Sequence, residues 1–264
     1  MVTWGIVADV HGNLEALEAA LGELERRGID RLACLGDLVG YNAGADGVVE
    51  KLERACALSI SGNHDLIALG AMGLERCWYQ AAHALARTRQ TLGRRARRYL
   101  EALPRHASLG EHILLVHGDL DDPQRYLRTP RDIAESAVRV RERFPKTRVV
   151  LHGHTHERRV YRARGAEVER VQLTPTIWLD VPEGEILYVN PGSVDAQRKP
   201  EGVRRAELAL YDSARETIDL VSVPYDDDAT ERRARREGYR MSAAGKLAHE
   251  TGRALARVPR WLMG

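Results

Sequence analysis

Short polar segments that directly follow apolar runs constrain the fold of this 264-residue chain more than any other feature. Residues 5–8 and 113–116, for example, are apolar runs of strand length, and each leads into an aspartate or a histidine. The five segments, in chain order, are Asp9-Val10-His11, Gly36-Asp37, Gly62-Asn63-His64-Asp65, Val116-His117-Gly118 and Gly153-His154-Thr155-His156. In open α/β sheets, ligand sites assemble where the strands end. The pattern therefore predicts an α/β fold with a site at its strand ends.

The side chains in these segments are of the kinds that bind divalent transition metals. Carboxylates, imidazoles and amide oxygens suit Mn, Fe, Ni, Co or Zn, whereas structural zinc sites usually contain thiolates. The five segments together offer at least seven such side chains. Seven converging ligands are too many for one ion and suit two ions that share one carboxylate. We therefore expect two divalent metal ions, with Mn favoured, and a metal-dependent hydrolase.

The first half of the chain shows alternating strand and helix patterns. Leucines from Leu14 to Leu24 recur at helical spacing after Asn13, a predicted N-cap, and Gly28 is expected to end this helix. Residues 75–101 are strongly helical and rich in arginine. These features indicate βα units in the first half.

The second half is rich in strand-like runs with few helices between them. The runs cover residues 112–116, 147–151, 157–162, 166–173, 176–181, 186–189, 206–211 and 215–223. Mixed βα units followed by a β-rich half indicate two packed sheets with helices outside. From Asp226 the chain becomes polar and helical. We therefore predict one domain over residues 1–225 and a C-terminal helical appendage over residues 226–264 that packs on it.

Composition limits the class of protein. A hydrophobic content of 44% supports a core, and a net charge of +2 indicates no class of partner by itself. Cys34, Cys56 and Cys77 are odd in number and lie in apolar or helical stretches, which favours reduced thiols. The first strand leads to Asp9 almost from the N-terminus, so we expect no cleaved leader. No apolar run approaches the roughly 20 residues of a membrane span, and we expect a cytoplasmic protein.

Taken together, the five segments resemble the calcineurin-like metallophosphoesterase superfamily. The pattern D-x-H, GD, GNHD, a lone His before Gly, and GHTH occurs in order, and the NPGS segment at residues 190–193 extends the likeness. The spacings are 28 residues from Asp9 to Asp37 and 26 from Asp37 to Asn63. The resemblance implies a four-layer α/β/β/α sandwich of two mixed sheets. The ligands it implies are Asp9, His11 and His156 for one metal, Asn63, His117 and His154 for the other, and Asp37 as the bridge.

In this resemblance His64 follows a metal ligand without being one. It is the implied catalytic residue, placed to contact a phosphate oxygen or to protonate the leaving oxygen. Asn63, His64 and Arg198 are the predicted contacts to substrate, and Ser193 is a further candidate for the pocket. Two cations about 3.5–4 Å apart would lower the pKa of a bridging water and hold the phosphate for in-line attack.

The remaining histidines are not expected to bind metal. Strand alternation would place residues 152, 154 and 156 on the same side of the chain. His152 is not part of the family motif, however, so we expect it to be packed beside the site. The histidines expected to be structural or exposed are His83, His106, His112 and His249.

The segment after Asp37 departs from the protein Ser/Thr phosphatase branch of the superfamily, which carries GDxxDRG. Gly40 and Tyr41 stand where that branch has an acid, which orients its catalytic histidine, and an arginine. Asp65 or a backbone carbonyl is then the candidate to orient His64. The closest likeness is to small prokaryotic phosphodiesterases, so we expect a phosphodiester or nucleotide substrate. A phosphomonoesterase stays open, because Arg198 could restore the missing charge.

Two other functions stay open. Arginine clusters at 87–98 and 232–236 would favour a nuclease, but aromatics occur only at their edges, as Tyr99 and Tyr239, so nucleic acid is not the favoured partner. A catalytically silent scaffold of this architecture, like a retromer subunit, usually loses His64 or a ligand, and this chain retains all of them. The physiological substrate, the native metal and the oligomeric state do not follow from the sequence.

Overall fold

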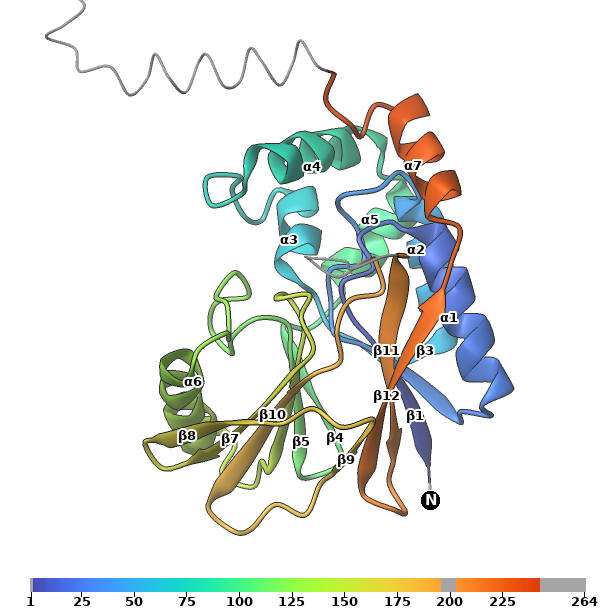
Figure 1. Ribbon diagram of the computed structural model, residues 1–264. Helices are drawn as coiled ribbons and strands as arrows, with labels where there is room; N and C mark the ends of the chain where they lie inside the picture. The colour runs from blue at the N-terminus through green and yellow to red at the C-terminus, as the bar shows by residue number, and fades with distance from the viewer. Residues whose placement is uncertain (1, 196–202, 243–264) are drawn as a thin grey trace, which may run out of the picture.

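The computed structural model describes residues 2–195 and 203–242, which form two six-stranded sheets packed face to face between outer helices (Figure 1). This is the four-layer α/β/β/α sandwich of two mixed sheets that the family resemblance implies. Within the described ranges, no helix combines the length and apolar character that a bilayer span requires.

The first sheet combines the N-terminal βα strands with late strands of the chain. In spatial order it contains β3 (Cys56–Ser59), β2 (Arg31–Cys34), β1 (Thr3–Val7), β11 (Arg205–Asp212), β12 (Thr217–Pro224) and β9 (Thr176–Trp178). β1, β2 and β3 pair in parallel, and the others pair antiparallel. The carboxyl ends of β1, β2 and β3 therefore meet at one edge of this sheet.

The second sheet has the same mixed character. In spatial order it contains β4 (His106–Leu109), β5 (Ile113–Val116), β6 (Val149–His152), β10 (Glu185–Asn190), β7 (Arg159–Arg164) and β8 (Glu167–Val171). β5, β6 and β10 pair in parallel at its centre, while β4, β7 and β8 pair antiparallel outside them.

The helices cover the outer faces of both sheets and the end where the parallel strands finish (Figure 1). They are α1 (Leu14–Arg26), α2 (Ala45–Ala55), α3 (Asn63–Leu69), α4 (Tyr79–Thr91), α5 (Arg94–Glu101), α6 (Pro130–Arg143) and α7 (Asp227–Arg236). α1 and α2 pack on the first sheet and α6 on the second. α3 and α4 contact each other near the strand ends.

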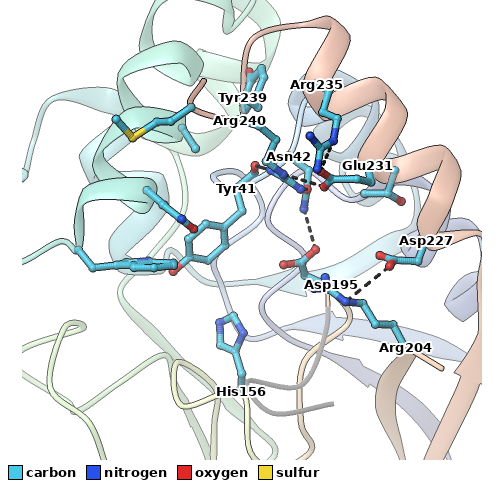
Figure 2. A pocket seen from close by; sticks show the side chains of 15 residues that line it. Tyr41, Asn42, His156, Asp195, Arg204, Asp227, Glu231, Arg235, Tyr239 and Arg240 are labelled. Atoms are coloured by element: carbon cyan, nitrogen blue, oxygen red, sulfur yellow. Dashed lines mark hydrogen bonds and ion pairs between the residues drawn. The ribbon is translucent and has the colours of Figure 1, made fainter. Parts of the chain in front are cut away.

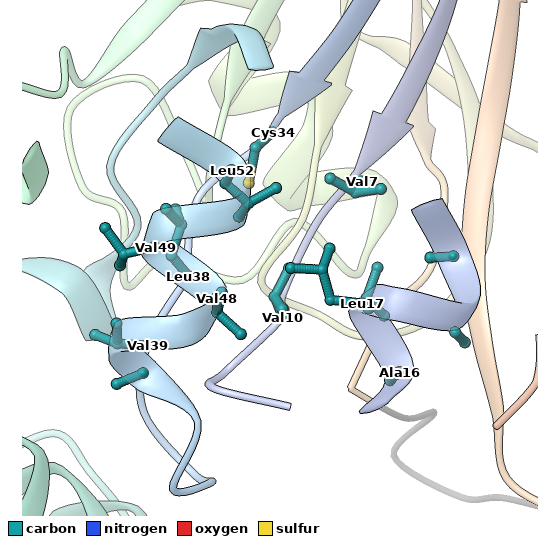
Figure 3. Close-up of a cluster of buried hydrophobic side chains, with 14 of the residues drawn as sticks. Val7, Val10, Ala16, Leu17, Cys34, Leu38, Val39, Val48, Val49 and Leu52 are labelled. Atoms are coloured by element: carbon teal, nitrogen blue, oxygen red, sulfur yellow. The ribbon is translucent and has the colours of Figure 1, made fainter. Parts of the chain in front are cut away.

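Side-chain alternation along the strands builds the apolar layers. Val7 of β1 packs with Leu17 of α1 on the helix side (Figure 3), whereas Ile6 points into the layer between the sheets. In β5, Leu115 joins Ile6 in that layer and Leu114 packs under α6. Burial of one such aliphatic side chain contributes about 1.5–3 kcal/mol, so these layers fix how the two sheets sit against each other.

Most predicted elements are present. The side chain of Asn13 caps α1 as predicted, and Gly28, at φ +67°, follows the end of that helix. The helix expected over residues 75–101 is instead two helices, because the backbone is extended at Gly93 and its N–H donates to Asp46 Oδ1 at 2.9 Å. β4, α3 and α6 are additional elements that the sequence analysis does not predict.

The start of the predicted C-terminal appendage is helical and packed. Ala234 of α7 is fully buried beside Ala84 of α4 and Tyr239. The hydroxyl of Thr230 donates to Asn13 Oδ1 at 2.9 Å, which joins α7 to the start of α1. The domain boundary at residue 225 stays a prediction, and residues 243–264 lie outside the described residues.

Candidate metal centre

All seven predicted ligands lie in segments that follow the carboxyl ends of parallel strands. β1, β2 and β3 of the first sheet and β5 and β6 of the second lead into these segments. Within the described ranges, three sets of side chains could each hold a metal ion, with ligand atoms within 4.8 Å of one another. The sets are Asp9, His11 and His156; Asp37, His117 and His154; and His11, Asp37 and His64.

The backbone is strained at most of these ligands. Only six described residues other than glycine have a positive φ, and five of them are predicted ligands: Asp9 (54°), His11 (51°), Asp37 (56°), His154 (64°) and His156 (55°). Each such conformation costs on the order of 1–3 kcal/mol and persists only where its surroundings impose it. The strain in this fold is thus concentrated where polar side chains turn from the strand direction into one cluster.

The ligand atoms face one another in a buried cluster. His117 Nε2 lies 3.1 Å from Asp37 Oδ2, and His156 Nε2 lies 3.5 Å from Asp9 Oδ1. His11 Nε2 lies 3.7 Å from Asp37 Oδ2 and 2.9 Å from His156 Nε2. Two imidazole nitrogens at that separation need a proton or a cation between them. The arrangement therefore fits divalent cations bound by nitrogen and oxygen.

Hydrogen bonds behind the ligands fix how they point. His117 Nδ1 lies 2.8 Å from the carbonyl oxygen of Leu35. With Nδ1–H donating there, the Nε2 lone pair faces the centre, as is usual for metal-binding histidines. The Asp9 carboxylate accepts from the backbone N–H of His154 at 3.0 Å, and Asp37 Oδ1 accepts from that of His64 at 2.7 Å. The two carboxylates are thus oriented by backbone groups.

The electrostatics of the cluster also favour a cation. Burial alone would lower the pKa of His117, but the carboxylates of Asp37 and Asp9 outweigh it and raise that pKa to about 9. Burial, and then a neighbouring histidine in each case, hold the pKa of His11 and of His154 well below the usual value. Burial would raise the pKa of Asp37, but the facing histidines hold it well below its usual range. Without a metal, Asp37 is thus anionic and His117 carries a proton beside it, while His11 and His154 are neutral. A divalent cation could take the place of that proton, because metal ligation requires neutral imidazoles and ionised carboxylates.

Asp65 holds the ligand loops together through hydrogen bonds from backbone N–H groups. Its Oδ2 accepts from the backbone N–H groups of Gly62 and Asp37, both at 2.9 Å. Its Oδ1 accepts from the N–H of Val39 at 3.1 Å. This fully buried carboxylate therefore ties the loop after β2 to the start of α3.

The ring of His64 is enclosed by the loop after Asp37. Its centroid lies 4.4 Å from that of His11 and 4.8 Å from that of Tyr41. A Cβ on Gly40, at φ +142°, would lie 2.3 Å from His64 Nδ1. Any larger residue at position 40 would have to displace this ring. Gly40 is therefore required by the close packing of His64.

His152 belongs to none of the metal-capable sets. β6 ends at His152, and the left-handed backbone at His154 and His156 breaks the alternation that would have put all three side chains on one side. His152 Nδ1 lies 3.4 Å from Asn190 Nδ2, and burial lowers its pKa to about 4. It is a neutral, packed histidine beside the centre.

A cavity of about 140 Å³ opens onto the metal centre, lined by Asp37, Asn63, His64, His154 and His156 together with loop residues. The loop residues include Arg76, Trp78, Gln124 and Tyr126. The ring of Tyr126 stacks on that of His154 with centroids 4.2 Å apart. Sequence analysis did not single out these four residues. Gln124 and Tyr126 lie in a loop without a motif, and Arg76 and Trp78 fall in the range predicted as helix, although the helix begins only at Tyr79.

Ser193 and Arg198 are the two further candidates to line the pocket. Ser193 is fully buried, and its hydroxyl donates to the backbone carbonyl of Asp9 at 3.0 Å, so it supports a ligand segment. Arg198 lies outside the described residues.

Comparisons with known proteins agree with this geometry. Residues 2–213 match a family model described as the calcineurin-like phosphoesterase superfamily domain. The chain is 29% identical over 224 residues to the uncharacterized protein MJ0912 of Methanocaldococcus jannaschii, covering 84% of this chain and 87% of that one. A metallophosphoesterase from Sphaerobacter thermophilus has a TM-score of 0.72 at 27% identity, covering 90% of this chain and 94% of its own. The hypothetical protein PH1004 from Pyrococcus horikoshii OT3 shares the fold, with a TM-score of 0.67 at 20% identity and the same coverage.

Proposed function

Since the chain belongs to the calcineurin-like phosphoesterase superfamily, whose members are metal-dependent phosphoester hydrolases, we propose that it hydrolyses a phosphodiester or nucleotide at a centre of two divalent ions. The observation that carries the proposal is the convergence of seven ligands from five strand ends of two sheets in one buried cluster. Each motif follows a single β-strand, so only the folded chain can bring the five segments together.

We assign Asp9, His11 and His156 to one ion, Asn63, His117 and His154 to the other, and Asp37 to both. Two of the three metal-capable sets support this division, and Asn63 Oδ1 lies 3.1 Å from His117 Nε2. When bound, the ions would supply Lewis acidity and a nucleophilic water at neutral pH. The nitrogen and oxygen ligands suit Mn, which we propose, and also Fe, Ni, Co or Zn.

His64 is the proposed general acid. Its ring lines the small cavity with Asn63, so it can hold a phosphate oxygen or protonate the leaving oxygen. Its backbone N–H is bound to Asp37, which fixes its position next to the centre independently of the ring.

A diester fits the cavity better than a dianionic monoester. Arg76 lines the cavity, but its guanidinium donates to Asp122 at 2.7 Å and to the carbonyl of Gln124 at 3.1 Å. Its charge is thus shared with a carboxylate of the chain. A diester carries one negative charge fewer than a monoester dianion and loses less from this pairing.

The alternative functions have less support. In the first arginine cluster, Arg87 and Arg89 donate to backbone carbonyls and Arg95 pairs with Glu53 at 2.8 Å. These guanidiniums serve contacts within the chain, so nucleic acid is not the favoured partner. A silent scaffold would not need His64 and the complete ligand set beside a cavity.

The test uses protein stripped with a chelator and reloaded with Mn, Ni, Co or Mg. We expect two ions per chain at saturation, loss of activity on chelation, and turnover of bis-p-nitrophenyl phosphate that matches or exceeds that of p-nitrophenyl phosphate at neutral pH. Binding of at most one ion, with metal content unchanged in Asp37→Asn, would remove the dinuclear centre. A preference for the monoester of about tenfold or more would make the protein a phosphomonoesterase.

A further inference from the structure

A second and larger cavity adjoins the metal centre (Figure 2). Its volume of about 540 Å³ lies within the range of small-molecule pockets, about 300–1,000 Å³. It shares Tyr41, Trp78 and His156 with the small cavity at the metals. A substrate whose phosphate lies at the metal centre can therefore extend past these rings into the larger cavity.

The charges that line this larger cavity cancel. They come from three arginines and three carboxylates: Arg204, Arg235, Arg240, Asp195, Asp227 and Glu231. Arg204 lies 3.5 Å from Asp227, and both Arg235 and Arg240 pair with Glu231 (Figure 2). The guanidiniums are thus already paired, so the cavity does not suit a second phosphate. It suits a neutral, polar part of a substrate.

The carboxylate of Asp195 lines this cavity. Asn13 and Asn42 both donate to Asp195 Oδ1, at 2.9 and 2.6 Å. Arg240 donates to Asn42 Oδ1 at 2.8 Å, which turns the amide NH₂ of Asn42 towards Asp195. No described residue donates to Asp195 Oδ2. That oxygen is therefore held in a fixed direction and can accept a hydroxyl or N–H of a ligand.

Aromatic side chains complete the cavity. The indole of Trp78, which is 52% exposed, and the ring of Tyr41 both line it at the side of the metal centre. Exposed aromatic faces bind nucleic-acid bases by stacking, and an acidic side chain commonly accepts from a sugar hydroxyl. Stacking surface, a carboxylate oxygen to which no described residue donates, and zero net charge among the lining side chains together match a nucleoside.

We propose that this cavity binds the nucleoside arm of a nucleotide phosphodiester. The base stacks on Trp78 and Tyr41, and a sugar hydroxyl donates to Asp195 Oδ2. This inference rests on the proposed phosphodiesterase activity and adds which arm of the ester the protein recognises.

Three p-nitrophenyl diesters with the same leaving group test it on the Mn-loaded full chain. Besides the p-nitrophenyl group, the first diester carries a methyl group and the second a choline. The third carries thymidine, linked through its 5′ oxygen. We expect kcat/KM for the thymidine ester to exceed that for the methyl ester by at least about tenfold, mostly through KM, as one base stack would give.

Two variants locate the effect. Trp78→Ala and Asp195→Asn should each lower the thymidine-to-methyl ratio of kcat/KM by about fivefold or more, on the basis of one lost stack or one lost charged acceptor. Trp178→Ala is the matched control, because Trp178 is also exposed (62%) but lies on β9 and not in the cavity. Its ratio should equal that of the unmodified protein.

The outcomes separate this inference from the proposed function. Equal kcat/KM for the methyl and thymidine esters would overturn the nucleoside site and leave the phosphodiesterase standing. If the choline ester were the best of the three substrates, the cavity would recognise a cationic group, and the nucleoside site would again be overturned. Failure to hydrolyse any diester would overturn the phosphodiesterase itself.

Discussion

At the scale of single residues, the neighbours of Asp37 are arranged to fix one carboxylate. Its backbone N–H is bound by Asp65, its Oδ1 accepts from the backbone of His64, and its Oδ2 faces His117 at 3.1 Å. A Cβ on Gly62 would lie 2.1 Å from Asp37 Oδ1, so only glycine permits this approach. Gly62 and Asp65 of the GNHD segment thus both position Asp37, the proposed bridging ligand.

His64→Ala separates the roles of acid and ligand. The backbone N–H to Asp37 survives the substitution, so we expect metal content to stay unchanged while turnover falls by roughly 10²–10⁴, the usual contribution of a general acid. Metal analysis and steady-state kinetics measure the two quantities. Loss of an ion would instead make His64 a ligand, as its set with His11 and Asp37 permits.

His152→Asn is the comparison for that variant. His152 packs beside the centre without joining any of the metal-capable sets. Its substitution should therefore change the free energy of unfolding more than the metal content. Complete loss of one ion in this variant would show that His152 is a ligand after all.

At the scale of elements, the segment from α7 to Arg240 braces the loop next to the metal centre. Arg240 donates to the carbonyl of Tyr41 at 2.7 Å, to Asn42 Oδ1 at 2.8 Å and to Glu231 at 2.8 Å. Tyr239 meets Thr91 of α4 with hydroxyl oxygens 2.9 Å apart. This segment therefore forms a wall of the larger cavity as well as packing on the domain.

Arg240→Ala tests this bracing. Removing a guanidinium that serves three acceptors should lower the free energy of unfolding by about 1–3 kcal/mol. The control is Arg232→Ala on α7, because the Arg232 side chain is 67% exposed and lies 3.8 Å from Asp226. That change should stay within about 0.5 kcal/mol. Urea unfolding of both variants measures the difference, and equal effects would mean that Arg240 contributes no more than a surface ion pair.

The sequence predicts the elements of the site much better than its surroundings. A strand and the ligand after it are adjacent in the chain, so apolar runs and motifs such as GNHD identify them locally. The larger cavity joins Tyr41, Trp78, Asp195 and Arg240 from distant segments, and only the packed fold brings these together. The side of His152 was mispredicted for a related reason, since periodicity does not register a left-handed backbone such as that of His154.

At the scale of the whole molecule, the candidate metal centre joins the two sheets. The first sheet supplies Asp9, Asp37 and Asn63, and the second supplies His117, His154 and His156 at the same end of the sandwich. An ion bound by both sets connects the sheets at this end, in addition to the apolar layer between them. The ligands converge only in the folded chain, so metal binding and folding are coupled.

Chelation should therefore destabilise the folded protein. Free metal at about 100 times its Kd stabilises by about 2.7 kcal/mol for each ion bound, which for a chain of this size corresponds to roughly 5–10 °C in Tm per ion. Scanning calorimetry with excess Mn and with chelator measures this increment. Asp37→Asn should reduce it, whereas Ile218→Ala, a change in the layer between the sheets, should lower stability by about 2–5 kcal/mol in both conditions and leave the increment intact. The same increment in Asp37→Asn as in the unmodified chain would mean that the metal binds elsewhere and does not join the sheets through this carboxylate.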